Sequence, residues 1–360
     1  MSVFEDGAFR HHESVHFFSD EPTGMQAIIA IHSTDLGPAL GGCRMVNYAN
    51  SAEALTDVLR LSRGMSLKNS LAGLELGGGK SVLMVPAAWG NDPKYAGPER
   101  ASLFQAFGHA VDSLGGRYIA AEDMNISVED AANMGKSTRH VVGLETGMGD
   151  PSPLTADGVF FGMRACIARA FGTTDFTGLT IAVQGLGKVG WRLCEQLHKA
   201  GAKLIVADIV DETLQRAKQQ FGAVIADKDG IVTTKCDVFA PCARGGVINA
   251  QTLGHLQTKV IAGSANNQLS KDELGAELQA KGILYAPDFV INAGGVINIA
   301  PEVNGVTDHK WVAGKVAALE QTVGEIIDRS IAENRSTNQV ADEIASARIL
   351  NARHQAAQAA

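Results

Sequence analysis

The sequence has little of what marks several common classes of protein. Five cysteines occur among 360 residues and none forms a CxxC pair, so neither a zinc site nor a disulfide framework is indicated. Apolar runs stay below the ~18 residues that a membrane span requires. The formal net charge of −8 argues against general nucleic-acid binding, which depends on neutralising phosphates. The opening MSVFEDGAFRHHES lacks the cationic and apolar parts of a signal peptide. We therefore expect a cytoplasmic protein without a membrane or nucleic-acid partner.

What is present describes a globular α/β chain. Apolar residues make up 45% and charged residues 19%, and the length allows two domains, each with its own core. From Ser152 on, strand and helix patterns alternate, as they do in a parallel sheet. The expected strands lie at 25–33, 81–85, 118–121, 179–184 and 203–208, and a strand that enters a glycine turn and a helix is expected within 286–300. One expected helix begins at Asn50 or Ser51, and others cover 99–114, 156–171, 308–335 and 338–356. A further helix is expected to follow Gly190 and to run to about residue 200, and a glycine-rich turn is expected at 36–42.

Two lysines frame a glycine run between residues 65 and 81. Lys68 precedes Lys80 by twelve residues, and Lys80 directly follows three glycines. Glycine runs occur where the backbone approaches something closely. Two ammonium groups in one pocket repel each other and burial disfavours their charge, so one is easier to deprotonate. The pattern is typical of a site that binds an anion and supplies an amine base. A glycine turn beside two solvated lysines is the alternative.

A dinucleotide site is indicated by five features in the required order. The strand ending at Gln184 runs into Gly185-Leu186-Gly187-Lys188-Val189-Gly190, a helix follows, and the next strand ends in Asp208. Gly185 makes the tight turn, Gly187 admits the pyrophosphate and Gly190 lets helix and strand pack. The helix N-terminus favours the negative charge of the pyrophosphate. Asp208 is expected to take the ribose hydroxyls of NAD and to repel a 2′-phosphate, because Ile209 and Val210 offer no arginine.

Other polar positions are less specific when they are considered alone. Asp123 ends a strand and is a candidate for proton transfer, although an ion-pair or capping role is commoner. Asn266 and Asn267 lie among small residues, where they are typical either of ligand binding or of turns. His12 and His16 have the spacing of a metal pair on a helix, but no third ligand lies nearby in the sequence, so we expect no metal site.

Taken together, these blocks resemble the glutamate, leucine, valine and phenylalanine dehydrogenase family, with the leucine-type branch closest. The resemblance covers nearly the whole chain. It rests on GPALGG at 37–42, MSLKNSLAGLELGGGK at 65–80, AED at 121–123, DPSPLTADGV at 150–159, VQGLGKVG at 183–190, AGSANNQL at 262–269 and VINAGGVIN at 290–298.

The resemblance implies an α/β fold with two domains and a deep cleft between them. An N-terminal α/β domain, residues 1–148 with 332–360, would bind the substrate and form oligomers, and residues 149–331 would form a Rossmann NAD-binding domain. It implies NAD-dependent, reversible oxidative deamination of leucine, valine or isoleucine to the 2-oxo acid and ammonia, by a homo-oligomer.

The resemblance also implies roles for single residues. Lys80 and Asp123 would be catalytic, and Lys68 would bind the substrate carboxylate. The other implied substrate contacts are Gly41, Gly42, Asn267 and, for the side chain, Leu40, Ala121 and Val290. The implied cofactor contacts beyond the glycine motif and Asp208 are Thr155, Asn266 and Asn292.

Two alternatives stay open at this point. Asn125 stands where leucine-type enzymes usually carry glycine and phenylalanine-type enzymes often carry asparagine, which favours an aromatic amino acid as substrate. Arg244 also departs from the leucine-type pattern, beside the expected ribose contacts. A non-catalytic NAD-binding sensor is the alternative from another class, and the presence of Lys68, Lys80 and Asp123 argues against it.

Overall fold

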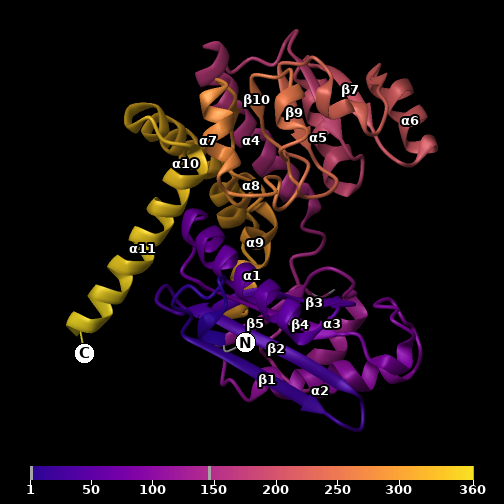
Figure 1. Ribbon diagram of the computed structural model, residues 1–360, viewed down its shortest axis with the longest axis vertical. Helices are drawn as coiled ribbons and strands as arrows, with labels where there is room; N and C mark the ends of the chain where they lie inside the picture. Colours follow the sequence, from indigo (N-terminus) through magenta and orange to yellow (C-terminus); the bar gives the residue numbers. More distant parts are fainter. Residues whose placement is uncertain (1–2, 145–146, 360) are drawn as a thin grey trace. The chain divides into compact units, whose positions relative to one another are not determined.

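The structure is a computed structural model that describes residues 3–144 and 147–359. It contains two separate β-sheets with helices, which confirms the α/β prediction (Figure 1). The chain forms two compact units. Unit 1 comprises Met1–Gly149, Ile299–Asp308 and Ala345–Ala360, and unit 2 comprises Asp150–Asn298 and His309–Ile344. Residues 332–344 thus belong to unit 2 and residues 299–308 to unit 1, whereas the predicted boundaries place 149–331 in the second domain and 332–360 in the first.

Unit 1 is built on a mixed five-stranded sheet in the order β1-β2-β4-β3-β5. β1 and β2 pair antiparallel, as do β2 and β4, whereas β3 runs parallel to both β4 and β5. The strands are β1 (Ser14–Asp20), β2 (Met25–Ser33), β3 (Ala39–Val46), β4 (Gly77–Met84) and β5 (Tyr118–Glu122). This order places β3 between the strands that carry Lys80 and precede Asp123.

Helices cover both faces of this sheet. α1 (Ser51–Leu71) begins where the sequence predicts, because the Asn50 side chain accepts hydrogen bonds from the backbone N–H groups of Ala52 and Glu53. Its apolar face packs on one side of the sheet through Leu55, Val58 and Leu59. α2 (Glu99–Asp112) and α3 (Val128–Gly135) contribute to the core on the other side.

The glycine runs lie inside strands, which corrects the prediction of a turn at 36–42 and of a strand starting only at residue 81. A Cβ added at Gly41 in β3 would lie 1.7 Å from the carbonyl oxygen of Gly79 in β4. A Cβ at Gly78 would lie 2.0 Å from the backbone nitrogen of Ser66 in α1. Glycine inside a strand often marks such a close approach of another backbone. The close approach predicted for the run is therefore made by helix α1.

Unit 2 is built on a six-stranded parallel sheet in the order β11-β10-β9-β6-β7-β8. Numbered from β6, this is the doubly wound order 3-2-1-4-5-6, with its switch point between β6 and β9. The strands are β6 (Thr180–Gln184), β7 (Lys203–Ala207), β8 (Val224–Ile225), β9 (Val238–Pro241), β10 (Val260–Ile261) and β11 (Leu284–Tyr285). The Rossmann arrangement expected from the sequence is therefore confirmed.

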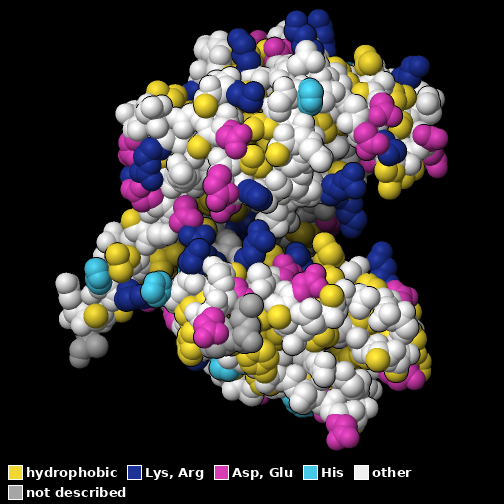
Figure 2. All heavy atoms as spheres, in the orientation of Figure 1, with side chains coloured by type: hydrophobic (Ala, Val, Ile, Leu, Met, Phe, Trp, Pro, Cys, Tyr) yellow, Lys and Arg dark blue, Asp and Glu magenta, His cyan; other side chains and the backbone are white. Residues whose placement is uncertain are grey.

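Three helices of unit 2 lie where the sequence predicts helices: α4 (Ser152–Phe171), α5 (Lys188–Lys199) and α10 (His309–Glu333). The helices α6 (Asp211–Phe221) and α7 (Leu274–Ala280) were not predicted individually. The apolar stripe of α10 is buried core, and ion pairs join α10 to α4 through Arg164–Glu320 and Arg169–Asp328. α6 buries only Leu214 and Ala217, and Figure 2 shows acidic and basic side chains side by side on the surface over this helix.

The segment 286–300 differs from the expected strand, turn and helix. β11 ends at Tyr285, and residues 288–291 form a short helix, α8 (Asp288–Ile291), before α9 (Gly294–Ile299). Pro287 at the N-cap of α8 explains the change, because it lacks an N–H for a sheet ladder and suits the start of a helix. The polar residue Asn292 is consequently the C-cap of a helix.

The last helix, α11 (Thr337–Ala359), contributes its C-terminal part to unit 1. Arg348 donates to the carbonyl oxygens of Ser70 and Leu74 at the end of α1, at 2.6 and 2.8 Å. Within the described ranges no helix combines the length and hydrophobicity of a membrane span. All five cysteines are free thiols.

Candidate active site and dinucleotide cradle

Lys80 and Asp123 form a buried ion pair. The Lys80 ammonium lies 2.9 Å from Oδ2 of Asp123, and its side chain is only 6% exposed. Lys80 projects from β4, and Asp123 directly follows β5. The structure thus brings together the two predicted catalytic residues, which are 43 positions apart in the sequence.

Gly42 makes this contact possible. It lies in β3, in register with Ala121 of β5. A Cβ added at Gly42 would lie 2.7 Å from Cβ of Asp123 and 3.2 Å from Nζ of Lys80. A side chain at this position would therefore push the pair apart, and we infer that glycine is needed here for the site geometry.

Arg44 is a member of this cluster that the sequence analysis missed. Its Nε donates to Oδ2 of Asp123 at 2.7 Å, and its Nη1 lies 3.4 Å from Oδ2 of Asp57 in α1. Tyr48 donates to the same Asp57 oxygen at 2.6 Å. Strand alternation gave a usable signal, because Arg44 lies two residues after Gly42 and therefore on the same face of β3.

The two cations control the charge of Asp123. Burial raises the pKa of its carboxyl group, but the opposing effects of Lys80 and Arg44, by charge and by hydrogen bonding, lower the pKa to about 2. Asp123 is consequently an anion near neutral pH. Arg44 shares the Asp123 oxygen with Lys80, and it was not predicted from the sequence.

Lys68 lies in the last turn of α1, close to the segment that carries Lys80. Its neighbour Asn69 donates from Nδ2 to the carbonyl oxygen of Gly77 at 2.6 Å. Together with the approach of Ser66 to Gly78, this bond fixes the end of α1 against β4. Lys68 is half-buried, and its contact with a substrate carboxylate stays a prediction.

The residues expected to contact the substrate side chain belong to both units. Leu40 pairs with Ile119 and with Gly78, and lies on the same face of β3 as Gly42. Ala121 is opposite Gly42 and 5% exposed. Val290 lies in α8 and, like Leu40, is fully buried. Their contact with a ligand stays a prediction, as it does for Gly41.

The glycine motif has the geometry that a dinucleotide requires. Gly185 has φ +94°, and a Cβ at Gly190 would lie 2.0 Å from the Gly185 carbonyl oxygen. Gly187 is the N-cap of α5, and a Cβ there would meet no described atom within 4 Å. Lys188 and Val189 form the first turn of α5. Backbone N–H groups at this N-terminus are suited to bind a pyrophosphate.

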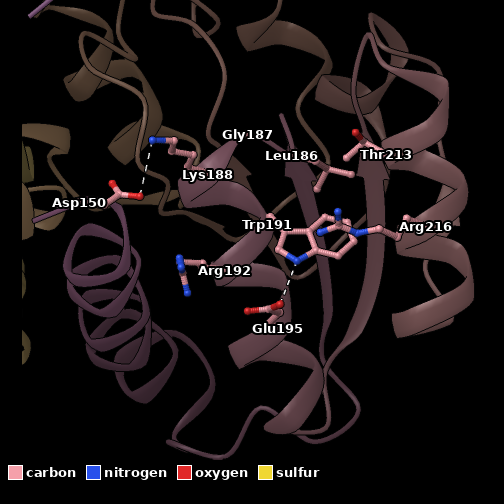
Figure 3. Close-up of a pocket in the computed structure, with 9 residues that line it drawn as sticks. All are labelled: Asp150, Leu186, Gly187, Lys188, Trp191, Arg192, Glu195, Thr213 and Arg216. Carbon is pink, nitrogen blue, oxygen red and sulfur yellow. Dashed lines mark hydrogen bonds and ion pairs between the residues drawn. The ribbon is translucent and has the colours of Figure 1, made fainter. Parts of the chain in front are cut away.

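A pocket of about 380 Å³ opens at this helix terminus (Figure 3). Its lining residues are Asp150, Leu186, Gly187, Lys188, Trp191, Arg192, Glu195, Thr213 and Arg216. The Arg216 guanidinium stacks over the Trp191 ring at 3.4 Å, and Glu195 accepts the indole N–H at 2.9 Å. The contacts among Trp191, Glu195 and Arg216 were not predicted from the sequence. The i,i+4 spacing of Trp191 and Glu195 is the one sequence feature that indicates a contact between two of them.

Asp208 is hydrogen-bonded to Leu186, which lines this pocket. Its carboxylate accepts hydrogen bonds from the backbone N–H groups of Leu186, at 2.6 Å, and Val210, at 3.0 Å. The acid at the end of β7 is therefore tied to the glycine turn, as a ribose-binding acid of this fold would be.

Two of the asparagines expected at the site are bonded to each other. Asn292 donates from Nδ2 to Oδ1 of Asn266 at 2.7 Å and to the Ser264 carbonyl oxygen at 3.1 Å. Its Oδ1 is buried and has no hydrogen-bond partner among the described residues. A buried acceptor without a donor is costly unless a ligand supplies one. Thr155 lies nearby, because a Cβ added at Gly295 of α9 would lie 3.2 Å from its Oγ1.

Asn267 lies in a turn, and its contact with the substrate stays a prediction; the two histidines are not arranged as a pair on a helix. Asn267 has φ +52°, a turn conformation that asparagine tolerates well, and its carbonyl oxygen accepts from Gly246 N–H at 2.7 Å. His12 and His16 do not share a helix: His16 lies in β1, and His12 stacks edge-on against His32. Among the residues that the structure describes, no group of three or more potential metal ligands is present.

The known proteins that this chain resembles are amino-acid dehydrogenases. Residues 12–140 match the Glu/Leu/Phe/Val dehydrogenase dimerisation domain, and residues 207–359 match the glutamate/leucine/phenylalanine/valine dehydrogenase family. The chain is 45% identical to leucine dehydrogenase of Bacillus subtilis, with 97% of this chain and 94% of that protein covered. Phenylalanine dehydrogenase of Bacillus thermotolerans is 44% identical, with 97% and 92% covered. The structure of L-tryptophan dehydrogenase from Nostoc punctiforme matches with a TM-score of 0.83 and 39% identity, covering 95% of this chain and 97% of that one.

Proposed function

Because the chain belongs to the Glu/Leu/Phe/Val dehydrogenase family, we propose that it oxidises a branched-chain aliphatic L-amino acid with NAD. The products are the 2-oxo acid, ammonia and NADH, and the reaction is reversible. The observation that carries the chemistry is the buried Lys80–Asp123 pair at 2.9 Å. A non-catalytic sensor would have no use for this costly arrangement of buried charges.

Each residue of the site has a step that it can perform. Lys68 binds the substrate carboxylate as a cation. The glycine motif and Asp208 would hold a nicotinamide cofactor, which would supply the acceptor for the hydride of the substrate α-carbon. Lys80, in its neutral form, takes a proton from water while the water oxygen bonds to the imine carbon and the C=N electron pair moves to nitrogen. Asp123 exchanges protons with the amino group, and ammonia leaves as the carbonyl forms.

The cofactor assignment to NAD rests on Asp208. Its carboxylate is fixed beside the glycine turn and would repel a 2′-phosphate. Arg216 in the neighbouring pocket is a cation, but its guanidinium is stacked on Trp191. At the other end of the cofactor, the unsatisfied Oδ1 of Asn292 suits the N–H of the nicotinamide carboxamide, with Asn266 and Thr155 beside it.

The substrate assignment follows the leucine-type relatives and the presence of Ala121. An alanine methyl group in the side-chain pocket takes space that an aromatic ring would need. The alternative is an aromatic substrate, which the phenylalanine and tryptophan dehydrogenases among the relatives keep open. The structure removes one argument for it: Asn125 has φ +62° and donates to the Met45 carbonyl oxygen at 2.9 Å. Glycine and asparagine exchange readily in that conformation.

We assign substrate binding and oligomerisation to unit 1 and cofactor binding to unit 2. The match of residues 12–140 to a dimerisation domain supports a homo-oligomer. The thiol state of all five cysteines supports a reducing, cytoplasmic location.

A stoichiometric assay tests the proposed reaction. The purified protein is incubated with L-leucine and NAD, and NADH, ammonia and 4-methyl-2-oxopentanoate are measured. We expect the three products in equal amounts, and reversal when ammonia and the oxo acid are supplied with NADH. NADH formation without ammonia would disprove oxidative deamination.

A further inference from the structure

Arg44 is a buried cation at the reaction site to which the reaction as described gives no task. Its side chain is 15% exposed and reaches the catalytic carboxylate from the strand between those of Lys80 and Asp123. Both cations approach the same oxygen, Oδ2 of Asp123, at 2.7 and 2.9 Å. That leaves Oδ1 of Asp123 as the oxygen for proton exchange with the substrate.

The chemistry creates a difficulty that a second cation removes. Lys80 has to be neutral when it accepts a proton from water. If Lys80 were the only partner of Asp123, its deprotonation would leave an unpaired anion in a buried site, which is strongly unfavourable. The proton would then stay shared between the two groups. A guanidinium cannot supply that proton, since arginine stays charged throughout the working range of pH.

We propose that Arg44 is a positioning residue that keeps Asp123 paired and anionic by holding its Oδ2, so that Lys80 can release its proton. This inference rests on the proposed function, because it assigns Lys80 the role of base.

Only a few ionisable groups near the Lys80–Asp123 pair are charged. Burial raises the pKa of Cys43 to about 12 and raises the pKa values of Tyr48 and Tyr118, so these three stay neutral. The charged residues on the elements around the pair include Arg44 on β3, Asp57 and Lys68 on α1, and Glu122 at the end of β5, and the ion-pair network joins Arg44 and Asp57 to it. Asp57 shares Arg44 with Asp123 and is itself bonded to Tyr48.

The test is the pH dependence of kcat/KM for the amino acid in Arg44→Met, Arg44→Lys, Asp57→Asn and Tyr48→Phe. Without the guanidinium, the acid limb of the profile moves to higher pH by about 1 unit, the size expected for one charge at this distance. Arg44→Lys keeps the charge, so its acid limb should lie close to the wild-type position. Asp57→Asn removes a negative charge and moves the limb the other way. Tyr48→Phe leaves the limb in place, since it removes only the outermost bond of the network.

Lys80 acetylation gives a second measurement that needs no turnover. Pulses of acetic anhydride across a pH series, read by mass spectrometry, report the fraction of neutral amine at Lys80. We expect half-maximal labelling at higher pH in Arg44→Met than in the wild type, with wild-type thermal stability checked in parallel. An unshifted limb and unshifted labelling in Arg44→Met, or shifts of equal sign in Arg44→Met and Asp57→Asn, would overturn the proposal. A wild-type protein without amino-acid-dependent NADH formation would instead overturn the proposed function, whatever the labelling shows.

Discussion

A substitution of Lys80 is expected to affect catalysis without affecting cofactor binding. It projects from unit 1, whereas the glycine cradle and Asp208 belong to unit 2. We expect Lys80→Ala to lower kcat by about 10²- to 10⁴-fold, the usual contribution of a general base, while NADH binding measured by fluorescence persists. Lys68→Ala is the comparison: it removes the proposed contact with the substrate carboxylate and should mainly raise KM. Near-normal kcat in Lys80→Ala would remove this residue from the mechanism.

Ala121 carries the prediction about side-chain size. Replacing it with glycine enlarges the expected pocket by one methyl group, and we expect kcat/KM to shift toward phenylalanine by at most ~1–3 kcal/mol. Ala120→Gly is a matched control, because Ala120 points into the core on the opposite face of β5. It should lower stability and leave the leucine-to-phenylalanine ratio unchanged. Equal selectivity changes in both variants would mean that Ala121 does not line the pocket.

Among the helices and strands, the sequence predicts a feature correctly where the residues of one segment determine its conformation. The strand, glycine turn and helix around Gly185 were read directly, because each glycine acts on its immediate neighbours. The Asn50 cap of α1 is equally local. Arg44 was missed because its contact with Asp123 spans 79 positions and depends on β3 lying between β4 and β5. The glycines of β3 and β4 were taken for turns, since their reason is the close approach of α1 and of neighbouring strands.

Asp208, at the junction of β6, β7 and α5, carries the prediction about cofactor choice. Asp208→Asn keeps an acceptor for the Leu186 N–H and removes the charge. We expect the ratio of kcat/KM for NAD over NADP to fall on the order of 10- to 100-fold, as the like-charge repulsion is lost. Asp211→Asn, at the exposed first turn of α6, should leave the ratio unchanged. A wild type that uses both cofactors equally would show that Asp208 does not face the ribose.

The packing of β2 against α1 makes stability depend on pH. Burial, followed by the charges of His12 and Arg63, lowers the pKa of His32 to about 3, while its Nδ1 bonds to Ser66 at 2.8 Å. A pKa below the unfolded value of about 6.5 means that folding favours the neutral ring. This stability is present above pH 6.5 and is lost as the pH falls toward 3.

Urea unfolding at pH 7 and pH 5 measures this effect. We expect the wild type to lose roughly 2 kcal/mol more than His32→Gln over this interval. The exposed His354 of α11 provides the control, since His354→Gln should retain the wild-type pH dependence. Asp123 contributes only at lower pH, because its pKa falls from 3.8 to about 2. The same slope in His32→Gln and wild type would place the acid sensitivity elsewhere.

Across the whole molecule, the residues proposed for catalysis and those proposed for cofactor binding lie in different units. Unit 1 provides the Lys80–Asp123–Arg44 cluster, and unit 2 provides the cradle, Asp208 and the Asn292 acceptor. The relatives share this whole-chain plan but differ in the amino acid that their names specify. We therefore expect a few side chains on a common scaffold to decide the identity of the substrate.

The substrate profile tests the central claim most directly. Values of kcat/KM with NAD are measured for L-leucine, L-valine, L-isoleucine, L-phenylalanine and L-tryptophan under one set of conditions. We predict that the three branched aliphatic substrates exceed both aromatic ones, with overlap among the three because one methylene changes discrimination by only ~1–3 kcal/mol. A higher kcat/KM for phenylalanine or tryptophan than for leucine would contradict the account.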